Sequence, residues 1–414
     1  MEHVRKQAEA AKKASYELGL LGTDQKNAIL LAMADALEAD SAAILAENQK
    51  DVDAAKAAGR TAALIDRLSL SESRIKGMAD GLRQVASLDD PIGEGLETLK
   101  RPNGLEITKR RVPLGVGGIM YEARPNVTAD AIGLTIKSGN AVVLRGGSEA
   151  FASNNAVVKS VVTAANQAGL PKGAIQLLQD TSREAATYMM TLNGLISVLI
   201  PRGGAGLIKS VLENATIPAI ETGTGNCHVY IDDSADLNMG VEILFNGKTQ
   251  RPAVCNAVES LLVAESVAAD FLPMAYKKLS EKNVEFRGCA KTCAILKEAV
   301  PATEEDYYTE YLDYILSVKV VKDVFEAIDH INQYGTMHSE TIITNDYNNS
   351  KRFMDRVDAA AVYTNASTRF TDGEMFGFGA EIGISTQKLH ARGPMGLKEL
   401  TTIKYVIEGT GQIR

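Results

Sequence analysis

The sequence has 414 residues, of which 45% are hydrophobic and 23% charged, as in ordinary soluble globular proteins. This length predicts two or three domains with large cores. The net charge is −8 and Lys and Arg are spread along the chain, which argues against nucleic acid as a partner. Four cysteines are too few for a disulfide framework, and Cys289 and Cys293 lack a histidine at zinc-ligand spacing. With no signal region or membrane span, we expect a cytoplasmic enzyme without a metal or a membrane partner.

The first 90 residues or so have the composition of surface helices. Ala, Lys, Glu and Leu recur with helical spacing over Ala8–Leu18, Lys26–Ala39 and Ala42–Ala57. These segments carry many charges and no catalytic motif. We therefore expect helices that cover one face of a sheet.

A β-hairpin is predicted next. Two strand-like runs flank Pro102-Asn103-Gly104, which is a strong turn signal, and the second run ends in the cations at 109–111. Another strand-like run, Thr401–Ile407, is suited to pair with this hairpin in its own subunit or in another. The hairpin either takes part in subunit assembly or forms a solvated sheet edge. The sequence leaves both alternatives open.

Residues 113–220 alternate between strands and helices. This alternation, with uninterrupted apolar strands, predicts a parallel sheet that is covered on both faces and binds ligands beyond the carboxyl ends of its strands. The expected strands are Gly115–Met120, Ala141–Leu144, Ala174–Leu178 and Leu195–Ile200. The expected helices are Thr128–Lys137, Glu149–Ala168 and Arg183–Leu192.

Two of these strands are followed by an Arg-Gly-Gly turn. The turn residues are Arg145, Gly146, Gly147 and Ser148 after one strand, and Arg202, Gly203 and Gly204 after another. An arginine beside the amides of a helix start favours phosphate, so the two turns together predict a dinucleotide site. Neither matches the Gly-x-Gly-x-x-Gly fingerprint, and no carboxylate is evident for a ribose 2′-hydroxyl. Ordinary glycine turns are the alternative.

The nucleophile candidate is Cys255, which precedes the buried strand Ser260–Ala264. Lys248 and Arg251 lie close before it, and nearby positive charge lowers the pKa of a thiol towards neutrality. The alternative is a packing cysteine, which is the usual role of a buried unpaired thiol.

Glu221 and Cys255 resemble the general-base glutamate and the catalytic cysteine of the aldehyde dehydrogenase superfamily. Val112–Ile119 is similar to the first cofactor-domain strand of that superfamily. Glu310 lies in a segment that resembles the one whose glutamate reaches the nicotinamide ribose. The resemblance implies an α/β fold with two Rossmann-like parallel-sheet domains plus a small β oligomerisation element. Judged on its surroundings alone, Glu221 is either a base or a solvated carboxylate.

One branch, the γ-glutamyl phosphate reductases, resembles the chain more closely. The similarity is carried by Tyr121–Thr128, Leu144–Gly147, Ile200–Gly204 and Gly383–Pro394. It implies NADPH-dependent reduction of L-glutamate 5-phosphate to glutamate 5-semialdehyde with release of phosphate, the second step of proline biosynthesis. It also implies a homo-oligomer, a dimer or a tetramer. Glutamate 5-kinase, which makes the labile substrate, is a candidate partner.

The resemblance also divides the chain. It implies a cofactor-binding domain from residues 1–95 and 113–224 and a catalytic domain from 225–399. Residues 96–112 and 400–414 would form the oligomerisation element.

Departures from the superfamily pattern concern the cofactor and the oxyanion. Where the superfamily has a lysine on the adenosine ribose, this chain has Arg145 beside Ser148, which suits a 2′-phosphate and favours NADP over NAD. The oxyanion asparagine is not matched, because Asn126 lies past Pro125, so the Cys255 amide is the remaining donor. The candidate substrate-binding residues are Arg124, Asn126, Arg251, Lys388 and His390.

The expected mechanism is a thioester on Cys255 that a hydride reduces, and in this direction Glu221 is dispensable. The alternative enzyme is an NAD-linked aldehyde oxidiser in which Glu221 activates water. The alternative from another class is a structural protein that has lost catalysis.

Overall fold

The computed structural model describes the backbone of residues 1–414 and every side chain except those of Ala63 and Ala205. The chain folds into two compact units. The first consists of Met1–Thr222, Gly377–Gly383 and Met395–Arg414, and the second of Gly223–Phe376 and Ile384–Pro394.

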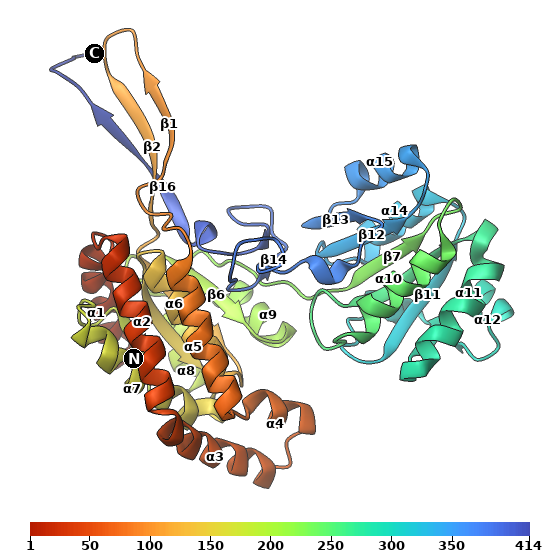
Figure 1. Ribbon diagram of the computed structural model, residues 1–414, viewed down its shortest axis with the longest axis horizontal. Coiled ribbons are helices and arrows are strands. Elements are labelled where there is room, and N and C mark those ends of the chain that lie inside the picture. Colours follow the sequence, from red (N-terminus) through yellow and green to blue (C-terminus); the bar gives the residue numbers. More distant parts are fainter. The chain divides into compact units, whose positions relative to one another are not determined.

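The first unit is built on a four-stranded parallel sheet in the order β5-β4-β3-β6 (Figure 1). Its strands are β3 (Val116–Tyr121), β4 (Ala141–Gly146), β5 (Ile175–Leu177) and β6 (Val198–Arg202). Its helices are α1 (Glu2–Leu18), α2 (Thr23–Ala39), α3 (Ser41–Ala57), α4 (Ala62–Leu68), α5 (Glu72–Ser87), α6 (Pro125–Lys137), α7 (Phe151–Gln167), α8 (Arg183–Met189) and α9 (Ala205–Asn214). The predicted strand–helix alternation is confirmed, because every expected strand overlaps a strand of this sheet, although β6 begins at Val198 and not at Leu195.

The second unit is a seven-stranded parallel sheet in the order β10-β9-β11-β8-β7-β12-β13. Its strands are β7 (Cys227–Ile231), β8 (Val258–Ala264), β9 (Glu285–Gly288), β10 (Val300–Pro301), β11 (Ile315–Val321), β12 (Ser339–Ile343) and β13 (Ala361–Thr364). Its helices are α10 (Leu237–Thr249), α11 (Glu265–Leu279), α12 (Ala290–Ile295), α13 (Glu304–Tyr308), α14 (Val324–Tyr334) and α15 (Tyr347–Arg356). A short antiparallel pair, β14 (Ile384–Ser385) and β15 (Gly393–Pro394), also belongs to this unit.

The central strands of the second sheet are buried on both faces. Alternate residues of β8 enter different cores: Leu261 and Val263 pack in one cluster, and Leu262 and Ala264 in the other. This period of two is the side-chain alternation of a β-strand. The expected α/β fold with two parallel-sheet units is confirmed.

The expected catalytic domain, residues 225–399, does not form one continuous unit in the structure. Residues 377–383 and 395–399 belong to the first unit. The Ile382 amide donates to the Met395 carbonyl at 2.9 Å, and the Met395 amide to the Gly383 carbonyl at 2.8 Å. A side chain at Gly379 would overlap Leu88. The expected domain is therefore interrupted, and only residues 384–394 return to the second unit.

A three-stranded antiparallel ribbon extends from the first unit (Figure 1). It consists of β1 (Gly95–Lys100), β2 (Glu106–Pro113) and β16 (Thr401–Glu408), in the order β1-β2-β16. The predicted hairpin is confirmed, and β16 pairs with it within the same chain. Among the described residues, none of the helices combines the length and the apolar composition that a bilayer crossing requires.

One face of this ribbon is apolar and uncovered. Leu99, Ile107 and Ile407 lie abreast across the three strands, and Tyr405 follows on the same face of β16. Tyr405 and Ile407 are each 58% exposed and Leu99 is 46% exposed. An uncovered apolar face with two open strand edges is the kind of surface that another chain covers.

We expect the double substitution Tyr405→Glu, Ile407→Glu to convert an oligomer into a monomer, because two carboxylates on this face oppose its burial. Size-exclusion chromatography with light scattering checks the mass. The matched control is Thr402→Glu, Lys404→Glu on the opposite face of β16. A wild type that is already monomeric, or a double variant with the wild-type mass, would contradict the assignment of this face to assembly.

Candidate active site

Cys255 lies in the loop between α10 and β8, at the amino-terminal edge of the second sheet. β7 begins beside it, since Cys227 pairs with Val258 at the start of β8. The Cys227 thiol donates to the Cys255 carbonyl oxygen at 3.1 Å. Burial raises the pKa of the Cys227 thiol well above its usual value, so this cysteine stays a protonated donor. Cys255 itself is half-buried, and none of the four cysteines forms a disulfide in the described structure.

The backbone of Gly225 lies directly against that of Cys255. A Cβ atom at residue 225 would overlap the Cys255 carbonyl group, so the contact requires glycine. The Gly225 amide donates to Oε1 of Glu310 at 2.7 Å, and burial raises the pKa of this carboxyl. Glu310, which we expected to bind the cofactor, thus also holds the glycine that packs on the nucleophile loop. The sequence analysis did not identify Gly225.

Lys248 does not supply the charge that the sequence predicts beside Cys255. Its ammonium group is fully buried and lies 2.5 Å from the carboxylate of Glu259. Glu259 also accepts a hydrogen bond from the Leu312 amide at 3.1 Å. Burial lowers the pKa of Lys248 and raises that of Glu259, while each partner favours the charged form of the other. The expectation is wrong, because the neutralising carboxylate comes from the following strand.

An arginine that the sequence analysis missed lies near the nucleophile instead. The Arg369 guanidinium donates to Oε1 of Gln250 at 3.0 Å, next to the exposed Arg251. Burial and then the charge of Arg251 lower the pKa of Arg369, whereas Cys255 acts in the opposite direction. The three groups are therefore within electrostatic range of one another. No local motif marks Arg369, because it comes from a turn distant in sequence.

The candidate substrate-binding residues Lys388 and His390 lie in a loop that salt bridges hold in place. Lys388 lies 2.6 Å and Arg392 2.7 Å from the carboxylate of Asp358. The hydrogen bonds from Lys388 and then Arg392 hold the pKa of Asp358 below its usual value. His390 is exposed, with a left-handed φ of 67°. Since one carboxylate engages both cations, this geometry favours a packed loop over an anion site.

Three other predicted residues belong to the first unit. Arg124 is the N-cap of α6 and is exposed. Asn126, one turn before Asp130, donates to its carboxylate at 3.4 Å. Glu221 is half-buried and follows Ile220, whose amide donates to the Leu199 carbonyl of β6 at 2.8 Å. Glu221 thus lies beyond the sheet of this unit, whereas Cys255 belongs to the second unit.

The first Arg-Gly-Gly turn, after β4, has the features of a ligand cradle. Arg145 donates through Nη2 to the Thr181 carbonyl at 2.7 Å, and its buried Nε has no partner in the described structure. A side chain at Gly146 would overlap Asn154, so packing within this unit requires the glycine. Burial lowers the pKa of Arg145 while the charge of Glu149 opposes this. Glu149 lies in the same turn, 3.8 Å from Arg60.

The second Arg-Gly-Gly turn, after β6, is already occupied by a carboxylate. Oε2 of Glu122 accepts a hydrogen bond from the Gly204 amide at 3.0 Å. A Cβ atom at Gly203 would lie 2.7 Å from the Glu122 carboxyl carbon. Burial raises the pKa of Asp130 to about 6, and Arg202 opposes this rise. Because the start of α9 is satisfied by Glu122, this turn is the weaker phosphate site.

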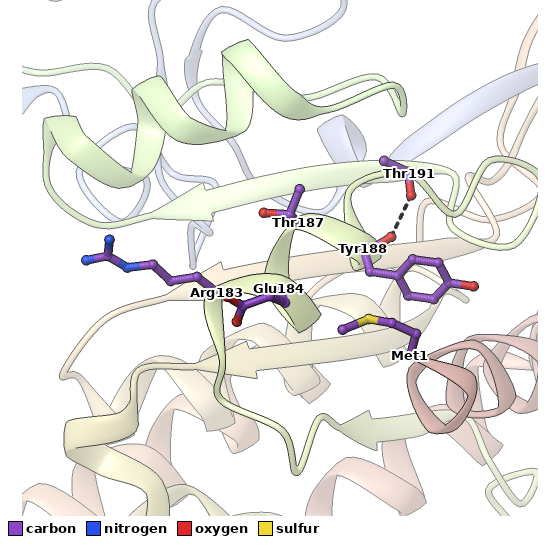
Figure 2. Close-up of a pocket in the computed structure, with 6 residues that line it drawn as sticks. All are labelled: Met1, Arg183, Glu184, Thr187, Tyr188 and Thr191. Atoms are coloured by element: carbon purple, nitrogen blue, oxygen red, sulfur yellow. Dashed lines mark hydrogen bonds between the residues drawn. The ribbon is translucent and has the colours of Figure 1, made fainter.

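A recess elsewhere in the first unit contains none of these residues. One face of α8 and the adjoining turn line it together with Met1 (Figure 2). Its lining residues are Met1, Arg183, Glu184, Thr187, Tyr188 and Thr191. Among the described residues, no group of three His, Cys, Asp or Glu side chains is arranged to hold a metal ion.

Comparisons with known proteins agree with the resemblance noted in the sequence. The family model described as "Aldehyde dehydrogenase family" matches residues 1–287. The chain is 63% identical over 404 residues to the gamma-glutamyl phosphate reductase of Clostridium perfringens strain ATCC 13124, which covers 98% of this chain and 97% of that relative.

Solved structures give the same result. The crystal structure of gamma-glutamyl phosphate reductase from Thermotoga maritima has a TM-score of 0.97 and 48% identity, covering 99% of both chains. An engineered glycolyl-CoA reductase with bound NADP⁺ has a TM-score of 0.68 at 16% identity, covers 97% of this chain and 96% of its own, and shares the fold alone. The chain therefore belongs to the aldehyde dehydrogenase family, in its gamma-glutamyl phosphate reductase branch, and is an oxidoreductase.

Proposed function

We propose that this chain reduces L-glutamate 5-phosphate to L-glutamate 5-semialdehyde with NADPH and releases phosphate, the second step of proline biosynthesis. The observation that carries the proposal is Cys255, whose loop is held by Gly225 and Cys227 while its own thiol remains half-buried. Similarity to gamma-glutamyl phosphate reductases over 98% of the chain supports the substrate class. Membership of the aldehyde dehydrogenase family supports a nicotinamide cofactor.

The chemistry centres on the Cys255 sulfur. The thiolate attacks the acyl carbon, a C–S bond forms, and the C–O bond to phosphate breaks with its electron pair on the phosphate oxygen. The Cys255 amide donates to the oxyanion that develops on the acyl group. When bound, the reduced nicotinamide supplies the hydride that brings the thioester to the aldehyde level. The C–S bond then breaks and restores the thiolate, and no water is needed, so Glu221 is not required.

The turn after β4 fits the adenosine end of this cofactor. The unpartnered Nε of Arg145 supports this assignment, because a charge-assisted hydrogen bond from a guanidinium suits a 2′-phosphate. Ser148 adds a hydroxyl to this turn. At the nicotinamide end, Glu310 uses Oε1 to hold Gly225 and keeps Oε2 for a ribose hydroxyl.

For the substrate, Arg124 and Arg251 are the proposed cations. Both are exposed. L-glutamate 5-phosphate carries an acyl phosphate at one end and an α-carboxylate at the other, so two anions need partners. Lys388 is a weaker choice, because Asp358 already engages it.

We expect Cys255→Ala to lower phosphate-dependent reduction of NADP by glutamate 5-semialdehyde by at least about 10⁴-fold, because the nucleophile is lost. Absorbance of the reduced cofactor measures the reaction, with and without inorganic phosphate. Cys293→Ala is the matched control and retains the wild-type rate.

We expect the rate of Glu221→Gln to stay within about tenfold of the wild-type rate, because no general base is needed in this reaction. A general base that took part would contribute about 10²–10⁴-fold. Wild-type reduction that does not depend on phosphate would instead indicate the hydrolytic dehydrogenase, with Glu221 as its base.

We expect Arg145→Gln to weaken NADPH binding by about 10- to 100-fold and NADH binding far less, because a charge-assisted bond to the 2′-phosphate is lost. Equilibrium titration of cofactor fluorescence measures both dissociation constants without turnover. Lys172→Gln removes an exposed cation before β5, at the other edge of the sheet, and serves as the control. Equal losses for the two cofactors would assign Arg145 to a structural role.

A further inference from the structure

The turn that carries Arg369 is hydrogen-bonded to residues that precede and follow Cys255 in the sequence. The Thr368 hydroxyl donates to the Asn256 carbonyl at 2.7 Å, and the Asn256 amide group donates to the Thr371 carbonyl at 2.9 Å. On the other side of Cys255, Arg369 donates through Nε to Gln250 at 3.0 Å. These bonds fix the turn against the residue that follows the cysteine and against the segment that precedes it. The Arg369 side chain is thereby held at the nucleophile loop.

Neither Arg251 nor Arg369 has a carboxylate partner in the described structure. The acidic residue whose charge reaches Arg369 is Asp372. Oδ1 of Asp372 instead accepts hydrogen bonds from the amides of Glu374 at 2.9 Å and Met375 at 3.2 Å. Like charges held close together without a counterion are costly unless an anion joins them. Two unpaired guanidinium groups beside a nucleophile therefore form an anion site.

Three other cations of this unit are neutralised by carboxylates. Lys248 is paired with Glu259, and Lys388 and Arg392 share Asp358. The Arg251–Arg369 pair is thus the place in the second unit where a multiply charged anion gains most. Guanidinium groups bind phosphate oxygens through paired N–H bonds, and phosphate carries more negative charge than a carboxylate, which favours it between two cations.

We propose that Arg369 acts with Arg251 to bind the phosphate group of the acyl phosphate as it leaves, and inorganic phosphate in the reverse direction. This inference rests on the proposed function. As the C–O bond breaks, negative charge accumulates on the departing phosphate, and two fixed cations stabilise it without reorganisation. The carbonyl oxygen is left to the Cys255 amide.

The test is the phosphate dependence of the reverse reaction in Arg369→Gln, Arg369→Lys and Arg251→Gln. We expect either glutamine variant to raise the KM for phosphate by about 10- to 100-fold, as for a lost charged hydrogen bond, while the KM for semialdehyde stays within about twofold. Arg369→Lys recovers part of the phosphate affinity, because the charge remains but the paired geometry is lost. The control is Arg352→Gln on α15, an exposed-face arginine bonded to Asn349.

A second measurement needs no turnover and no cofactor. Phosphate bound at this pair shields Cys255 from iodoacetamide, so the phosphate concentration for half-protection rises in Arg369→Gln by the same factor as the KM. Unchanged protection in a variant with a wild-type thermal midpoint overturns the inference. A raised KM for semialdehyde instead of phosphate also overturns it and assigns the pair to the α-carboxylate. If phosphate affects neither reaction nor alkylation in the wild type, the proposed function itself has failed.

Discussion

The nucleophile loop can take its path only because residue 225 has no side chain. The Gly225 backbone occupies the space where any Cβ would meet the Cys255 carbonyl, and Cys227 donates to that same carbonyl from the start of β7. Glu310 fixes Gly225 in turn. The cysteine is therefore positioned by backbone packing at the amino edge of two central strands, before any ligand binds. A nucleophile held in this way loses little entropy on reaction.

Charge is arranged in two layers around this loop. In the interior, Lys248 and Glu259 neutralise each other, which fixes α10 to β8 without leaving a net charge. Towards the outside, Arg251 and Arg369 lack carboxylate partners in the described structure and are the groups left for an anion. The same distinction separates the two Arg-Gly-Gly turns: Glu122 satisfies Gly204, whereas Arg145 keeps an unpartnered Nε. Residue type alone does not distinguish a neutralised cation from an available one.

The features that sequence predicted well are local. Apolar runs and the Pro-Asn-Gly turn indicated the sheets and the hairpin, because each depends on residues close together in the chain. The family was predictable for a similar reason, since its motifs are contiguous. The pairing of Lys248 with Glu259, the contact of Gly225 with Cys255 and the place of Arg369 were not. Each depends on how segments distant in the sequence pack together. The return of residues 384–394 to the second unit was also not predicted, because no change in composition marks it.

Covalent acylation of Cys255 is the central claim of this account, and intact-protein mass spectrometry tests it most directly. The acyl phosphate would be generated in place from glutamate, ATP and glutamate 5-kinase, mixed with the enzyme in the absence of cofactor, and quenched with acid. The account predicts a stoichiometric γ-glutamyl adduct on Cys255 that disappears when NADPH is added and is missing from Cys255→Ala. An adduct that persists in Cys255→Ala, or reduction by NADPH at the full rate without any adduct, would contradict it.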